Sequence, residues 1–156
     1  MPLVRILVDG YSLLHDWPEL AAGRSRHSAP ARDALIRVLT DYQDACGTPI
    51  TVFFDGKGAP PGTPSPHSSR EMEVIFSRGQ KTADEMIERT AHLLRPYGDV
   101  LVITNDHTER DIVIGLGCQA MSCLTFRRTM ESEFGELSSH LEKHNRRERL
   151  QFRQPQ

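Results

Sequence analysis

The sequence predicts an α/β protein with three layers, in which helices cover both faces of a mostly parallel central sheet of about five strands. Short apolar runs with few polar residues are typical of parallel strands, because both faces of such strands are buried. Segments with helical spacing of apolar residues separate these runs, and that alternation favours a parallel sheet. The predicted strands are residues 3–8, 50–54, 72–76, 100–104 and 120–126.

Helices are expected between these strands, over about residues 30–46, 82–94, 108–116 and 129–149. Thr82 is predicted to be an N-cap, because Glu85 three residues later completes a capping box. Thr108 is the predicted cap of the next helix, and the last helix is strongly charged. The segment around Trp17-Pro18 is expected to be a loop.

Length and composition indicate one globular domain spanning residues 1–156, with a charged helix and tail from about residue 129. Lys and Arg number 19 against 21 Asp and Glu, so net charge gives no sign of a nucleic-acid partner. A carboxylate metal site would subtract charges that bound cations restore, which weakens that exclusion. Three cysteines, an odd count, favour free thiols and a cytoplasmic location. No apolar stretch approaches the ~20 residues of a membrane span.

A Gly- and Pro-rich segment over residues 56–66 is too irregular for a helix or strand. A domain linker is one interpretation, but neither half of the chain alone has the core of a domain. We therefore expect a surface loop. Its position directly after Asp55 favours a role in substrate access.

Four acidic residues lie where a parallel sheet collects functional groups. Asp9, Asp55 and Asp106 follow predicted strands, and Asp84 lies at a predicted helix start. Ligands of open α/β sheets bind beyond the carboxyl ends of the strands. Carboxylates gathered there repel one another unless a divalent cation lies among them. The simplest chemistry for such a cluster is metal-assisted hydrolysis of a phosphodiester.

Each acid also has a structural interpretation. Asp9-Gly10 resembles an ordinary turn, and Asp106 lies in a polar strand-to-helix loop. Asp84 and Glu85 would stabilise the positive end of a helix without binding any ligand. Glu85 is predicted to be either the capping partner or an outer ligand of the metal, but not both.

The predicted cofactor is Mg²⁺ or Mn²⁺, both of which prefer oxygen ligands. Two such ions ~3.5–4 Å apart would activate the attacking water and stabilise the leaving oxygen. Asp9, Asp84 and Asp106 are the predicted inner ligands, and Asp55 is an inner or outer one. Zinc fits less well, because Cys118 and Cys123 lack a second pair of ligands.

Residues near these acids in the sequence are candidates for binding the substrate. Basic side chains would contact phosphates, Tyr11 would stack on a base, and Asn105 and Ser12 would hydrogen-bond carboxylates or water. The candidates are Tyr11, Ser12, Arg70, Arg78, Lys81, Asn105 and Arg110. The basic C-terminal segment, residues 143–153, is either a further foothold for RNA or a solvated helix face.

Several strings resemble, in order, those of the YacP-like ribonuclease family, in the NYN branch of the PIN-like nuclease superfamily. They are Val8-Asp9-Gly10-Tyr11-Ser12, Trp17-Pro18, Arg32-Asp33-Ala34-Leu35-Ile36, Val52-Phe53-Phe54-Asp55, Glu73-Val74-Ile75-Phe76, Thr82-Ala83-Asp84-Glu85 and Thr104-Asn105-Asp106-His107-Thr108-Glu109. The resemblance implies a PIN-like fold, dependence on Mg²⁺ or Mn²⁺, and endonucleolytic cleavage of RNA. It assigns metal binding to Asp9, Asp84 and Asp106, and less directly to Asp55 and Glu85.

One position departs from the family pattern, which has Asn where this chain has Ser12. A hydroxyl is shorter and lacks the paired donor and acceptor of an amide. The alternative function is therefore an RNA-binding module with weakened or lost nuclease activity. A DNA nuclease ranks last, because the chain lacks room for additional helices. The expected partner is single-stranded RNA or mRNA, in a ribonucleoprotein or free, while oligomeric state stays open.

Overall fold

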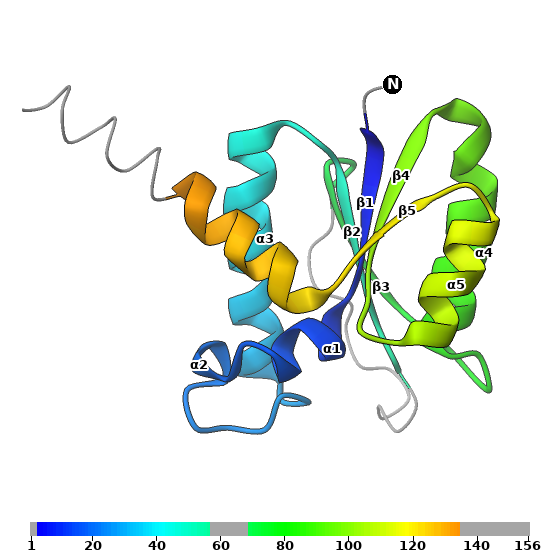
Figure 1. Ribbon diagram of the computed structural model, residues 1–156. Helices are drawn as coiled ribbons and strands as arrows, with labels where there is room; N and C mark the ends of the chain where they lie inside the picture. Colours follow the sequence, from blue (N-terminus) through cyan, green and yellow to red (C-terminus); the bar gives the residue numbers. More distant parts are fainter. Residues whose placement is uncertain (1–2, 57–68, 135–156) are drawn as a thin grey trace, which may run out of the picture.

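The computed structural model describes residues 3–56 and 69–134. Five parallel strands form one sheet in the order β3-β2-β1-β4-β5, with β1 in the middle (Figure 1). Their bounds are β1 Leu3–Asp9, β2 Ile50–Phe54, β3 Met72–Phe76, β4 Asp99–Ile103 and β5 Gln119–Met121. The predicted three-layer α/β class is confirmed.

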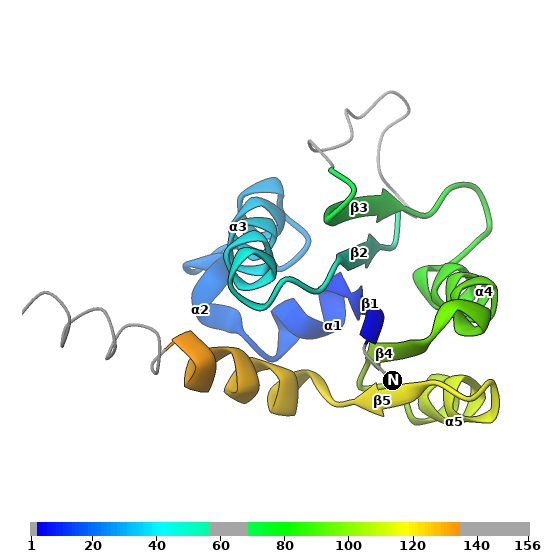
Figure 2. The same cartoon turned by 90° about the horizontal axis from the view of Figure 1, so that it is seen from above.

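Helices cover both faces of this sheet, as Figure 2 shows from above. The first layer holds α1 Gly10–His15, α2 Pro18–Ala21, α3 Ala29–Cys46 and a last helix that begins at Cys123 and is described to residue 134. The second layer holds α4 Ala83–Leu94 and α5 His107–Gly115, with the short 3-10 helix η1 Arg95–Tyr97 between α4 and β4. Among the described residues, no helix combines the length and the apolar character that a membrane span requires.

Alternating side chains of the central strands supply two cores. Ile6 and Val8 of β1 pack into the core under α3, whereas Leu7 between them packs into the core under α4. Phe53 on β2 is likewise turned to the α4 side and is fully buried. Burial on both faces explains why these strands are almost continuously apolar in sequence.

Most predicted elements are confirmed, and the errors lie near chain segments with mixed patterns. β2 and β3 have the predicted bounds, and Thr82 caps α4 by accepting a hydrogen bond from the Glu85 amide. The predicted loop around Trp17 is wrong in part, because α1 and α2 occupy much of it. The predicted fifth strand is too long, since its second half begins the last helix at Cys123 instead. Short helices and an edge strand carry too few residues for periodicity to distinguish them.

Two predictions fall largely outside the described residues. The Gly- and Pro-rich loop predicted over residues 56–66 is described only at Gly56. The predicted charged helix over residues 129–149 is described to residue 134 and is helical there, although its helix begins earlier.

Gly10 permits the chain to turn from β1 directly into α1. A Cβ atom at this position would overlap the ring of Phe54, which is fully buried in the core. The absence of a side chain therefore allows Asp9 to be both the last residue of β1 and the N-cap of α1.

We expect Gly10→Ala to destabilise the protein by about 1–3 kcal/mol, because the Phe54 ring must move within a packed core. Urea unfolding would reveal a lower midpoint with an unchanged slope. Gly115→Ala is the matched control, since a Cβ there meets open space. Equal midpoints for the two variants would contradict the steric argument.

Candidate metal centre

The carboxyl ends of β1, β2 and β4 bring three of the predicted acids to one edge of the sheet. Asp9 ends β1, Asp55 follows β2, and Asp106 lies three residues after β4 ends at Ile103. β1 pairs with β2 on one side and β4 on the other, so the chain leaves the sheet centre in both directions here. Ligands of open α/β sheets bind at such a point.

Asp9 is held by Ser12, one turn further along α1. The Asp9 carboxylate accepts the Ser12 amide at 3.4 Å and the Ser12 hydroxyl at 2.9 Å. Burial raises the pKa of Asp9, the hydrogen bond from Ser12 opposes that rise, and the charges of Asp84 and Asp55 add to it. Ser12 therefore fixes the orientation of this carboxylate although it is shorter than Asn.

Asp106 is the N-cap of α5, and the prediction that Thr108 fills this role is wrong. The Asp106 carboxylate accepts the amides of Thr108 at 2.9 Å and Glu109 at 3.3 Å through one oxygen, Oδ1. Its own amide donates to the hydroxyl of buried Thr104. Among the described residues only Oδ1 accepts hydrogen bonds, which leaves Oδ2 for a further ligand.

Asp84, Asp106 and Glu109 form a cluster that could hold a metal ion. One carboxylate oxygen from each residue lies within 4.8 Å of the others. Asp84 is in the first turn of α4, and Glu109 is in the first turn of α5. This is the one such group of three found within residues 3–56 and 69–134.

Glu109 is the member of this cluster that the sequence analysis missed. Glu109 is 2% exposed, and within residues 3–56 and 69–134 no donor group forms a hydrogen bond to either of its carboxylate oxygens. Burial raises the pKa of Glu109 far above 4.5, and the adjacent Asp84 carboxylate raises it further. Two neighbouring carboxylates attract each other only through a shared proton or a cation. The available signal was its spacing, because Glu109 and buried Val113 share one face of α5.

Other acids surround this cluster. The charge of Asp9 adds to the rise in the pKa of Glu109, and Glu88 contributes as well. Burial raises the pKa of Glu88 itself, with further contributions from Asp84, Glu85 and Asp106. Glu85 is exposed and is not part of the cluster, whereas the charge of Glu88, on the next turn, acts on Glu109.

Asp55 lies at the side of this arrangement. Its carboxylate accepts the hydroxyl of buried Ser77 at 3.2 Å, and that hydroxyl also accepts the Gly56 amide. Asp55 contributes to the raised pKa of Asp9, which places its charge near the edge of the site. These contacts are consistent with Asp55 lying outside the carboxylates that would contact the metal directly.

Only some of the predicted substrate-binding residues lie near the acidic edge of the sheet. Arg110 and Lys81 are exposed near the starts of α5 and α4, beside the acids. Arg70 lies just before β3, at the opposite end of the sheet from the acidic edge, and the structure does not bring it to the site. The Tyr11 hydroxyl accepts a hydrogen bond from Arg32 at 3.3 Å. The centre of its ring lies 4.5 Å from the ring centre of His27 and 5.1 Å from that of Phe54.

Asn105 is engaged in holding the site together. Its amide donates to the Asp16 carboxylate at 2.6 Å, and its oxygen accepts the Cys123 amide at 3.0 Å. Asp16 caps the end of α1, and Cys123 begins the last helix. Asn105 therefore links the loop that carries Asp106 to two elements of the other layer.

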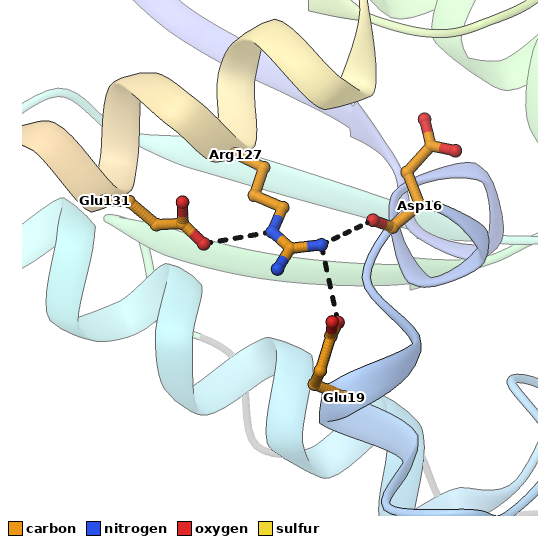
Figure 3. A network of polar contacts seen from close by, with 4 residues as sticks. All are labelled: Asp16, Glu19, Arg127 and Glu131. Atoms are coloured by element: carbon orange, nitrogen blue, oxygen red, sulfur yellow. Dashed lines mark hydrogen bonds and ion pairs between the residues drawn. The ribbon is translucent and has the colours of Figure 1, made fainter.

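Arg127 of the last helix connects this helix to α1 and α2, as Figure 3 shows. Its guanidinium donates to the backbone oxygen of Asp16 at 2.8 Å and pairs with Glu19 at 3.4 Å and Glu131 at 3.0 Å. It also lies 5.1 Å from the centre of the Trp17 ring. Trp17 packs against the core, so its role here is structural.

We expect Asn105→Ala to lower both stability and metal affinity, because it removes both links. Loss of the two hydrogen bonds should cost about 1–3 kcal/mol, and loosening of the Asp106 loop should weaken Mn²⁺ binding roughly 10-fold. Thermal melts with and without Mn²⁺ would measure both effects. A changed KM for RNA with unaltered melting would instead indicate direct substrate contact.

The fold and the acidic edge define an α/β domain suited to binding a divalent cation where a substrate can approach. The chain matches the YacP-like NYN domain over residues 6–155 and belongs to that family. It is 33% identical over 128 residues to the Bacillus subtilis protein YacP, covering 81% of this chain and 75% of that one. This confirms the resemblance found in the sequence.

Solved structures agree with this assignment to the family. The crystal structure of Rae1 (YacP) from Bacillus subtilis superposes with a TM-score of 0.76 at 28% identity, covering 96% of this chain and 85% of that one. The crystal structure of a mutant form of the same protein also superposes with a TM-score of 0.76, at 30% identity, covering 90% of this chain and 82% of that one. The family implies a nuclease-type function in RNA processing.

Proposed function

We propose that this protein is an endoribonuclease that hydrolyses RNA phosphodiester bonds with Mg²⁺ or Mn²⁺. The observation that carries the proposal is Glu109, a buried carboxylate that accepts no hydrogen bond from the described residues and lies against Asp84. Burying an unpartnered anion is costly, and a second anion beside it raises the cost. A divalent cation at this position would offset both effects.

The donor set suits a hard cation. Asp84, Asp106 and Glu109 offer only oxygen, which Mg²⁺ and Mn²⁺ prefer over nitrogen or sulfur. Asp9 lies close enough to add its charge to Glu109, and it would complete the set from β1. When bound, the cation would activate a water for attack and neutralise charge on the phosphate and leaving oxygen.

The protein's own groups would prepare this chemistry. Ser12 orients the Asp9 carboxylate through a 2.9 Å hydrogen bond, and the amides of α5 orient that of Asp106. Both carboxylates are therefore fixed before substrate arrives, which reduces reorganisation on binding. The chemistry needs no covalent nucleophile.

The test is a panel of RNA and DNA oligonucleotides incubated with wild type, Asp9→Asn and Asp106→Asn, with and without Mg²⁺ or Mn²⁺. We expect RNA to be cut internally by the wild type in a metal-dependent manner and DNA to be spared. Cleavage at the wild-type rate by both variants would refute the assignment.

Ser12 motivates a second candidate, an RNA-binding module whose nuclease activity is weakened or lost. In that case RNA would bind with a clear salt dependence and remain intact with every divalent metal. Ser12→Asn would then restore cleavage. The hydrogen bond from Ser12 to Asp9 favours the active enzyme, because the support for this carboxylate is kept.

A further inference from the structure

A groove lies between the outer strand β3 and helix α4, next to the metal centre. It consists of a cavity of about 480 Å³ against the end of β3 and a second of about 360 Å³ along the outer face of α4. Lys81 and Met86 line both cavities, so the two adjoin. Volumes of this size are typical of ligand sites.

The groove exists because α4 does not cover the whole sheet. α4 packs on β1, β2 and β4. Ile75 of β3 is the register partner of Phe53 and faces the same side, but Phe53 is fully buried whereas Ile75 is partly exposed. The sheet therefore extends one strand beyond its helical cover, and the open strip forms the floor of the groove.

Positive charge collects along this groove in a protein whose net charge is −2. Arg78, Lys81 and Arg89 line it and are exposed, and Glu85 is the acidic residue among the described side chains of the lining. Within residues 3–56 and 69–134, none of the three cations is paired with a carboxylate. Unpaired cations beside an acidic centre are suited to a polyanion that spans both.

The groove and the metal centre flank the start of α4 from opposite sides. Lys81 directly precedes the cap residue Thr82, and Asp84 lies on the face of α4 that meets Asp106 and Glu109. Met86 and Arg89 follow Asp84 by two and five residues, about 200° and 140° around the helix, so they lie on the other side of α4. A chain with one phosphate at the acids would pass around the start of α4, by way of Lys81, to enter the groove.

Apolar side chains complete the lining. Ile75 and Met86 are partly exposed within it, and Leu93 is 60% exposed at its far end. Single-strand sites combine cations that contact phosphates with side chains that contact base faces, and aliphatic side chains would take that second part here. A duplex would present its phosphates but keep its base faces stacked inside.

We propose that this groove binds the nucleotides adjacent to the scissile phosphate of a single-stranded RNA. Arg78, Lys81 and Arg89 contact the phosphates, and Met86 contacts a base. This inference rests on the proposed function, because it extends the substrate path away from the same metal centre.

The experiment measures binding of a fluorescent 12-nucleotide single-stranded RNA in EDTA, which keeps the RNA intact, across a series of KCl concentrations. We expect Arg78→Ala/Lys81→Ala to weaken binding at least about 10-fold at low salt and to reduce the slope of log Kd against log[KCl] by about 1.4, or ~0.7 for each lost phosphate contact. Arg24→Ala/Arg37→Ala removes two exposed charges from the other layer and should behave as wild type.

A second variant tests the contact with bases. Met86→Glu should reduce the preference for single-stranded RNA over a duplex of the same sequence. Unchanged melting temperatures would verify that the substituted proteins are folded.

Several outcomes would overturn the inference. Wild-type affinity and salt slope in the Arg78/Lys81 variant would remove the groove from the substrate path. Equal affinity of the wild type for duplex and single strand, or equal competition by an acidic peptide, would replace it with an unspecific attraction for polyanions. Failure of the proposed function is recognised separately, as absence of metal-dependent RNA cleavage by the wild type.

Discussion

Asp84→Asn is expected to lower the rate of RNA cleavage with Mn²⁺ by at least about 100-fold, more than the 10–100-fold typical of losing an outer partner of a metal site. The amide keeps the size of the side chain but removes the charge from the centre of the cluster with Asp106 and Glu109. Initial rates on a labelled RNA at saturating metal would measure the effect.

Two neighbouring substitutions sharpen this prediction. Asp111→Asn changes an exposed acid outside the cluster, so its rate should match the wild type. Glu85→Gln changes the adjacent exposed acid, which the sequence analysis included among the metal ligands. A loss for Glu85→Gln as large as that for Asp84→Asn would show that the cluster has been assigned to the wrong residues.

Glu109→Gln is expected to stabilise the metal-free protein while removing the stabilisation that metal supplies. Folding raises the pKa of Glu109 well above 4.5, so the folded state binds more protons than the unfolded state once the pH exceeds about 4.5. This residue therefore makes the free energy of unfolding of the wild type fall as the pH rises from about 4.5 to about 10. A neutral glutamine removes this dependence.

The expected gain in metal-free stability near pH 7 is on the order of 1–2 kcal/mol, which corresponds to a rise of roughly 2–8 °C in Tm for a domain of this size. The gain should shrink toward pH 4.5 and vanish below it, where the wild-type carboxyl is protonated in both states. Calorimetry in EDTA from pH 5 to 8 would measure it.

Adding Mn²⁺ tests the other half of the same prediction. Wild-type Tm should rise with Mn²⁺ concentration, because a ligand that binds only the folded state stabilises it. The Tm of the Glu109→Gln variant should rise much less over the same Mn²⁺ concentrations. A wild type that melts identically in EDTA and in millimolar Mn²⁺ would contradict a functional cation site.

The sequence was sufficient for the fold class and for much of the acidic edge, because both depend on local patterns. An apolar strand followed at once by Asp, as at Asp9 and Asp55, indicates a sheet end without knowledge of its neighbours. The start of α4 was equally readable, since Thr82 and Glu85 carry the capping pattern within four residues.

The errors arose where two local interpretations compete. Asp106 and Thr108 are both good caps, and the choice between them depends on where β4 ends and how the loop crosses the sheet edge. The apolar residues around Cys123 suit a strand or a buried helix start, and packing of Phe126 and Met130 into the first core decides for the helix.

Sequence alone determined that this chain forms a parallel α/β sheet with carboxylates at its C-terminal edge, because strand periodicity and chain punctuation are properties of neighbouring residues. Tertiary structure alone decided that Glu109 is buried against Asp84, that Asn105 ties Asp106 to Asp16, and that β3 extends beyond α4 to leave a groove. The physical reason is that burial and charge coupling depend on the order in which strands pack, and residues 25 or 89 positions apart meet only once that order is established.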